Sequence, residues 1–158
     1  KELSKTATVI SVLVLVSMGI FASLRMGGFV FDGSLQMWWG MVFSFIVLFP
    51  HEILHAVCFK EDVYLYTNWK QGMLFVVGPE TMSKGRFIFM SMLPNIVFGI
   101  LPYIVGMIHP QFVFGLVFGI LSASMGAGDY YNVYNAVTQM PKGARTYLYQ
   151  FHSYWYKP

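Results

Sequence analysis

The chain has 158 residues, of which 56% are hydrophobic and only 11% are charged. A soluble domain of this size carries about 25% charged residues, so the composition excludes an ordinary soluble domain and indicates an integral membrane protein of one domain, 1–158. The net charge of +3 is too small to indicate a nucleic-acid partner, and the single cysteine, Cys58, excludes an internal disulfide.

Apolar runs long enough to cross a bilayer predict an all-α membrane fold with about four transmembrane helices. The expected spans are about 6–24, 35–59, 87–108 and 111–128. The first is expected to be a retained helix and not a signal peptide, because no small-residue cleavage site followed by a soluble domain is seen. In the second, Pro50 removes one backbone hydrogen bond and is expected to bend the helix just before His51.

Two segments between and after these spans have a different character. Residues 63–66 and 73–77 are aromatic and β-branched, and the turn residues between them predict a β-hairpin over about 63–77. Such a hairpin can be an ordinary surface feature, but an exposed strand edge beside a hydrolytic centre can hold an extended peptide. The basic and aromatic stretch 141–158 is expected to lie along the membrane interface.

The distribution of positive charge predicts the orientation of the chain in the membrane. With four spans, nine of the ten Lys and Arg residues fall on the side of the two termini, and only Arg25 falls on the other. Cytoplasmic loops carry such an excess, so we expect a multi-pass protein of the cell membrane with both termini in the cytoplasm.

His51, Glu52 and His55 form an HExxH motif at the end of the second apolar run. Residues four apart on an α-helix lie about 40° apart around its axis, so both imidazoles can reach one ion. The intervening glutamate can take a proton from water at that ion. Three ionisable side chains so close together are costly in hydrocarbon, which favours a metal site over two histidines that merely cap a helix end.

A catalytic zinc site needs a third protein ligand and keeps its fourth position for water. Asp129 is the preferred third ligand, because it is the only acid at the end of a spanning run and that run returns to the side of the motif. Cys58 follows the motif closely, but we interpret it as a small packed residue. The other candidate ligands are the reserve His152 and, less favoured, His109, Asp62 and Glu80.

The same chemistry requires a donor for the oxyanion that forms when a carbonyl is attacked. Asn95, inside the third span, and Asn132, one turn after Asp129, are the two candidates, although a buried asparagine more often satisfies backbone groups. Glu52 is expected to act as the base and then to pass its proton to the leaving amine.

These motifs together resemble the DUF3267 family of membrane zincins. The resemblance lies in His51–Ala56 after a spanning run, the hairpin-like loop, Leu93-Pro94 in the next run and Gly128-Asp129 after the last, and it covers roughly residue 35 to the end. The family is similar in layout to the site-2 proteases, which cleave within or near the membrane. The chain departs from those proteases at Tyr130, where their motif has a glycine.

The resemblance implies zinc as the cofactor, with His51, His55 and Asp129 as its ligands and Glu52 as the catalytic base. The predicted function is therefore a zinc-dependent intramembrane or membrane-proximal protease that hydrolyses peptide bonds. Its expected partners are the lipid bilayer and a membrane-embedded or membrane-proximal protein substrate, with a homo-oligomer left open and no nucleic acid. The alternative is a non-catalytic metal-binding membrane scaffold, which a closed four-ligand shell would favour.

Overall fold

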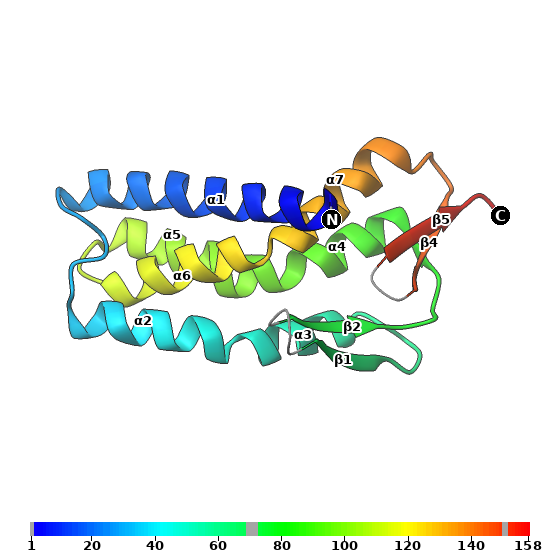
Figure 1. The fold of residues 1–158 in the computed structure, drawn as a ribbon, viewed down its shortest axis with the longest axis horizontal. Helices are drawn as coiled ribbons and strands as arrows, with labels where there is room; N and C mark the ends of the chain where they lie inside the picture. The colour runs from blue at the N-terminus through cyan, green and yellow to red at the C-terminus, as the bar shows by residue number, and fades with distance from the viewer. Residues whose placement is uncertain (1, 69–72, 150–151) are drawn as a thin grey trace. The chain divides into compact units, whose positions relative to one another are not determined.

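The computed structural model of this chain describes residues 2–68, 73–149 and 152–158 (Figure 1). Most of the described chain is helical, and its strands are short and antiparallel, which confirms the predicted fold at this level. The chain divides into two compact units. We call Lys1–Val47 with Asn95–Gly128 the first unit, and Leu48–Pro94 with Asp129–Pro158 the second unit.

The first unit is a bundle of helices around α6. Its helices are α1 (Glu2–Met26), α2 (Leu35–Ile46), the π-helix η1 (Asn95–Ile100), α5 (Leu101–Ile108) and α6 (Val113–Met125). Helix α6 packs against each of the others and fills the centre of the bundle (Figure 1). Its apolar side chains form the core, while apolar side chains of α1 such as Leu13 and Phe21 are 63% exposed. This apolar exterior suits a lipid environment.

Glycines allow the helices of the first unit to approach one another closely. A Cβ atom added at Gly119 would lie 2.7 Å from the Gly99 carbonyl oxygen, and one at Gly126 would lie 1.6 Å from Oδ1 of Asn95. No side chain fits at either distance. Small residues play this part in membrane helices, where close backbone contact replaces the hydrophobic driving force.

The second unit combines helices with two small sheets. Its helices are α3 (Leu48–Ala56), α4 (Lys84–Pro94) and α7 (Ala127–Gln139), which begins two residues before the unit does. Strand β1 (Tyr64–Asn68) pairs antiparallel with β2 (Met73–Val77), with Leu65 opposite Val76. A second sheet has the order β3-β4-β5, formed by Met82–Ser83, Arg145–Tyr149 and His152–Tyr156. The core holds Met82, Phe87, Met90, Ala136, Met140 and Ala144.

Length and composition identify the helices that can cross a membrane. Lys5–Met26 and Lys84–Ile108 qualify directly, and the number rises to four if the bent pairs α2 with α3 and α6 with α7 each form one span. The structure therefore supports two to four membrane-spanning segments.

The structure differs from the sequence-based expectations in three places. The second expected span breaks at Val47, three residues before Pro50, because Pro50 has no N–H to donate to the carbonyl of Ile46, where α2 ends. The stretch 141–158 forms strands β4 and β5. Asp129 lies in the first turn of α7, which continues the chain as a helix beyond the expected end of the fourth span.

Candidate metal centre

Helix α3 places the two motif histidines on one face. Their ring centroids are 4.9 Å apart, and the rings meet edge to face. Both side chains are largely buried, with 12% of His51 and 10% of His55 exposed. The four-residue spacing therefore produces the arrangement that the motif predicts, two imidazoles converging on one small volume.

Helix α7 brings the carboxylate of Asp129 to both imidazoles. Oδ2 lies 3.1 Å from Nε2 of His51, and Oδ1 lies 3.3 Å from Nε2 of His55. An acidic side chain in the first turn of a helix is also stabilised by the positive end of the helix dipole. The structure thus brings together the three side chains that the sequence analysis selected as ligands.

The other ring nitrogen of His55 is held by a backbone carbonyl on α4. Nδ1 lies 3.0 Å from the carbonyl oxygen of Met90, which can only accept, so Nδ1 carries the hydrogen and donates it. That carbonyl is available because the residue four positions later is Pro94, which has no N–H to offer it. This contact was not predicted from the sequence, although a proline inside a span always frees one carbonyl.

The tautomer of His55 determines what can lie between it and Asp129. With the hydrogen on Nδ1, neutral His55 presents a lone pair at Nε2, and this lone pair faces a carboxylate oxygen. Two acceptors at this distance need a positive charge between them, either a second proton on His55 or a metal cation. The carboxylate of Asp129 places Oδ2 near His51 and Oδ1 near His55, so these three side chains are close enough to hold one cation together.

Glu52 lies in the same cluster and is fixed by the first sheet. One donor atom each from His51, Glu52 and His55 lies within 4.8 Å of the others. Oε2 of Glu52 accepts a hydrogen bond of 2.9 Å from the N–H of Val76 on β2. Together with Asp129, the cluster holds two carboxylates and two imidazoles, and with both imidazoles unprotonated its net charge of −2 would be balanced by a divalent cation. The donor set therefore fits zinc.

The remaining candidate ligands have other positions. Glu80 is buried against Arg86, which donates to its carboxylate, and its Oε2 also accepts a 2.6 Å hydrogen bond from the N–H of Lys60. The hydrogen bond and charge of Arg86 and the N–H of Lys60 hold the pKa of Glu80 below its ordinary value. Glu80 is thus a structural ion-pair partner. Asp62 is exposed, and His109 caps α5 in the first unit. The side chain of His152 lies outside the described residues.

The residues flanking the motif are held by the same ion pair. Arg86 also donates to the carbonyl oxygen of Cys58, so one guanidinium joins Glu80 to the segment that follows α3. The thiol of Cys58 donates to the carbonyl of Leu54 at 3.4 Å, and burial raises its pKa. Both observations agree with the interpretation of Cys58 as a packed residue.

The two asparagines proposed as oxyanion donors differ in their surroundings. Asn95 belongs to the first unit, where it is 1% exposed and lies against Gly126. Asn132 belongs to α7, one turn after Asp129, and is partly exposed. Their role in stabilising an oxyanion stays a prediction.

A mostly helical chain with apolar helices of membrane-spanning length and an HExxH cluster beside an aspartate has the features of a membrane zincin. A family model supports this assignment: DUF3267, described as "Putative zincin peptidase", matches residues 44–145. The chain belongs to this family, as its motifs predict, and the match includes every residue of the candidate metal centre. No curated protein and no solved structure matches the chain.

Proposed function

We propose that this protein is a zinc-dependent membrane peptidase of the site-2-protease type. The observation that carries the proposal is the pairing of Asp129 with both motif histidines while Nδ1 of His55 is held by Met90. Metal-binding histidines characteristically donate their second ring nitrogen to a carbonyl or carboxylate, which fixes the tautomer and the ring orientation. A pair of histidines packed for structure alone does not need this arrangement.

His51, His55 and Asp129 are the residues that would hold the ion. Zinc, when bound, supplies a Lewis acid that polarises a peptide carbonyl and lowers the pKa of water. The protein contributes a His55 ring whose Nδ1 hydrogen is held by Met90, the two helices that bury the site and a carboxylate placed against both rings. Three protein donors leave a coordination position free, as catalytic zinc sites do.

Glu52 is the general base in this proposal. The N–H of Val76 binds one carboxylate oxygen, which leaves the other able to take a proton from water and to pass it to the leaving amine. Strand β2 therefore orients the base.

The first sheet offers a place for an extended peptide. The N–H of Val76 points to Glu52, so this part of the β2 backbone faces the metal centre and not its partner β1. Backbone groups on a strand edge can bind a peptide as an added strand. The substrate in this proposal is a membrane-embedded or membrane-proximal protein that presents an unfolded segment to β2.

Replacement of Glu52 by Gln tests the catalytic part of the proposal. Peptide termini generated in membranes that contain the wild-type protein should be missing from membranes that contain Glu52→Gln, as measured by mass spectrometry of neo-N-termini. The zinc content of the purified variant should equal that of the wild type, because Glu52 is not a ligand in this scheme. Persistence of the same termini in the variant would refute the assigned base.

The non-catalytic scaffold has one observation in its favour. The carboxylate of Glu52 lies within the same 4.8 Å cluster as the histidines, so it is close enough to serve as a fourth ligand. A closed shell of four protein ligands is typical of structural zinc. In that case Glu52→Gln would lose zinc, and the two functions are therefore separated by the metal content of this one variant.

A further inference from the structure

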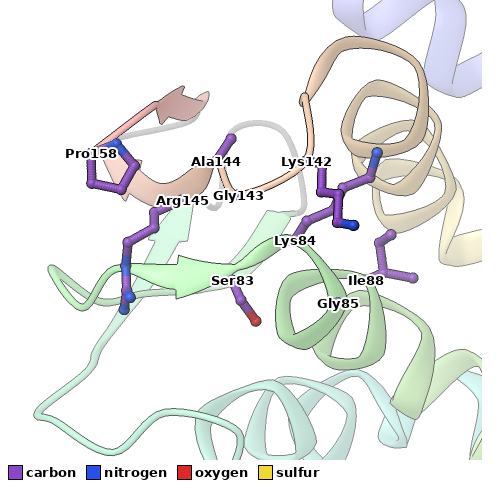
Figure 2. A pocket seen from close by; sticks show the side chains of 9 residues that line it. All are labelled: Ser83, Lys84, Gly85, Ile88, Lys142, Gly143, Ala144, Arg145 and Pro158. Carbon is purple, nitrogen blue, oxygen red and sulfur yellow. The ribbon is translucent and has the colours of Figure 1, made fainter.

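The second unit carries a basic pocket of about 540 Å³ (Figure 2). It lies at the junction of β3 and α4, beside the turn that precedes β4. Lys84 and Lys142 lie toward one end of the pocket, and Arg145 lies toward the other. Its lining includes the cations Lys84, Lys142 and Arg145 and the apolar side chain of Ile88.

Among the described residues, no Asp or Glu forms an ion pair with a cation of this pocket. None of the lining residues is acidic, and the sequence has no Asp or Glu in 81–94 or in 130–158. Nζ of Lys84 donates to the carbonyls of Val137 and Met140, which uses two of its three hydrogens and fixes its position. Arg145 is fixed by the side chain and carbonyl of Thr81. These cations are therefore held in place by neutral groups and retain their charge for an anion.

The pocket lies at the start of a candidate membrane span. Lys84 is the first residue of the span Lys84–Ile108, and Ile88, one turn further along α4, also lines the pocket. The adjoining hairpin of β4 and β5 exposes Tyr149, Tyr154 and Trp155. Tyrosine and tryptophan favour the boundary between membrane and water, where lipid headgroups lie. A span that begins at Lys84 would place these cations at headgroup level and Ile88 at the start of the apolar part of the span.

We propose that this pocket binds the phosphate headgroup of an anionic phospholipid. Lys84, Lys142 and Arg145 would contact the phosphate, and Ile88 would contact the first part of an acyl chain. A free phosphate ion would use the cations alone, whereas a lipid also uses the apolar lining and the position at the span. The proposal does not depend on catalysis at the metal centre.

Lipid binding to the purified full-length protein in detergent tests this proposal. Native mass spectrometry with added phosphatidylglycerol or phosphatidylcholine should show preferential retention of phosphatidylglycerol by the wild type. The variant Lys142→Gln should bind phosphatidylglycerol roughly fivefold more weakly than the wild type. The double variant that also carries Arg145→Gln should bind this lipid more weakly still. Lys142 is exposed and makes no contact on which the fold of the described chain depends, so the single variant should stay folded.

A control of equal charge separates this pocket from general electrostatic attraction. Lys5→Gln with Lys60→Gln removes two exposed cations that do not line the pocket, and it should keep the wild-type preference. Equal weakening by this control, or equal binding of both lipids by the wild type, would overturn the proposal. Millimolar inorganic phosphate should leave the lipid bound, and complete displacement would instead assign the pocket to free phosphate.

Discussion

The two units bury polar groups in different ways. Among the described residues, the two buried ionisable residues, His55 and Glu80, both belong to the second unit, and each has hydrogen-bonding partners. The first unit has an apolar core around α6, and its helices meet through glycines. Both units thus have apolar cores, and the second unit adds directional polar contacts around its buried ionisable groups.

This difference has a consequence for mutation. Changes in the first unit should act on stability through the volume of a side chain, because its contacts depend on shape. Changes in the second unit should act on the metal centre through donors and acceptors, because each buried polar group there depends on a particular partner. The predictions below test this contrast, from the largest expected effect to the smallest.

Loss of Asp129 should have the largest effect. Asp129→Ala removes the carboxylate that contacts both imidazoles, so zinc affinity should fall by more than the roughly 10–100-fold that is typical of an outer partner. Metal titration of the purified variant measures this affinity. Unchanged stoichiometric zinc would remove Asp129 from the proposed ligand set.

In the first unit, a single methyl group at Gly126 should destabilise the fold. Gly126→Ala places a carbon 1.6 Å from Oδ1 of Asn95, and the resulting overpacking should cost roughly 1–3 kcal/mol. Denaturation in detergent monitored by circular dichroism measures this change. Gly128→Ala is the matched control, because a Cβ there meets nothing within 4 Å. Equal stability of the two variants would contradict the close contact.

Replacement of Pro94 should lower the affinity for zinc, although Pro94 is not a proposed ligand. Pro94→Ala restores an N–H that competes with His55 for the Met90 carbonyl, so zinc affinity should fall roughly 10-fold while the ligands remain. Pro102→Ala, which changes a proline of the first unit, is expected to leave zinc affinity unchanged. The same metal titration decides the question, and equal affinities of these two variants would refute the role of the freed carbonyl.

The smallest effect is a dependence of stability on pH that comes from Glu80. Because its pKa in the folded protein lies below the ordinary value of 4.5, the Arg86 pair contributes stability above that value. This contribution is lost as the pH falls through the lowered pKa. Glu80→Gln should remove that part of the acid dependence, by roughly 1 kcal/mol or less. Stability–pH curves of the same shape for the wild type and Glu80→Gln would contradict this contribution of Glu80.

The clustering of His51, His55 and Asp129 could be predicted from the sequence to a large extent. The HExxH spacing predicts that His51 and His55 share a helix face. Asp129 is predicted beside them because it is the only acid at the end of a spanning run, and that run returns to the side of the motif. The contacts of Met90 and Val76 could not be predicted in the same way. They are made by backbone groups, which every residue has, so residue type alone gives no signal for them.

The fold was less predictable where long-range pairing decides the structure. The strands β4 and β5 lie in a stretch rich in aromatic residues, but their sheet also requires β3, more than sixty residues earlier in the chain. Helix α7 has many tyrosines and asparagines and no clear apolar periodicity after Asp129, so its sequence gives a weak helical signal. In both cases tertiary contacts outweigh local preference.

The proline at position 94 has a consequence for protein engineering. Without Pro94, the carbonyl of Met90 would accept a hydrogen bond from its own helix. The imidazole of His55 on the neighbouring helix would then be free to rotate or to exchange its tautomer. A designed helical bundle that reproduces this cluster would therefore need more than the side chains of His51, Glu52, His55 and Asp129. The helix that supplies the carbonyl would also need a proline four residues after it. A design that copies only the ligand positions would omit this proline.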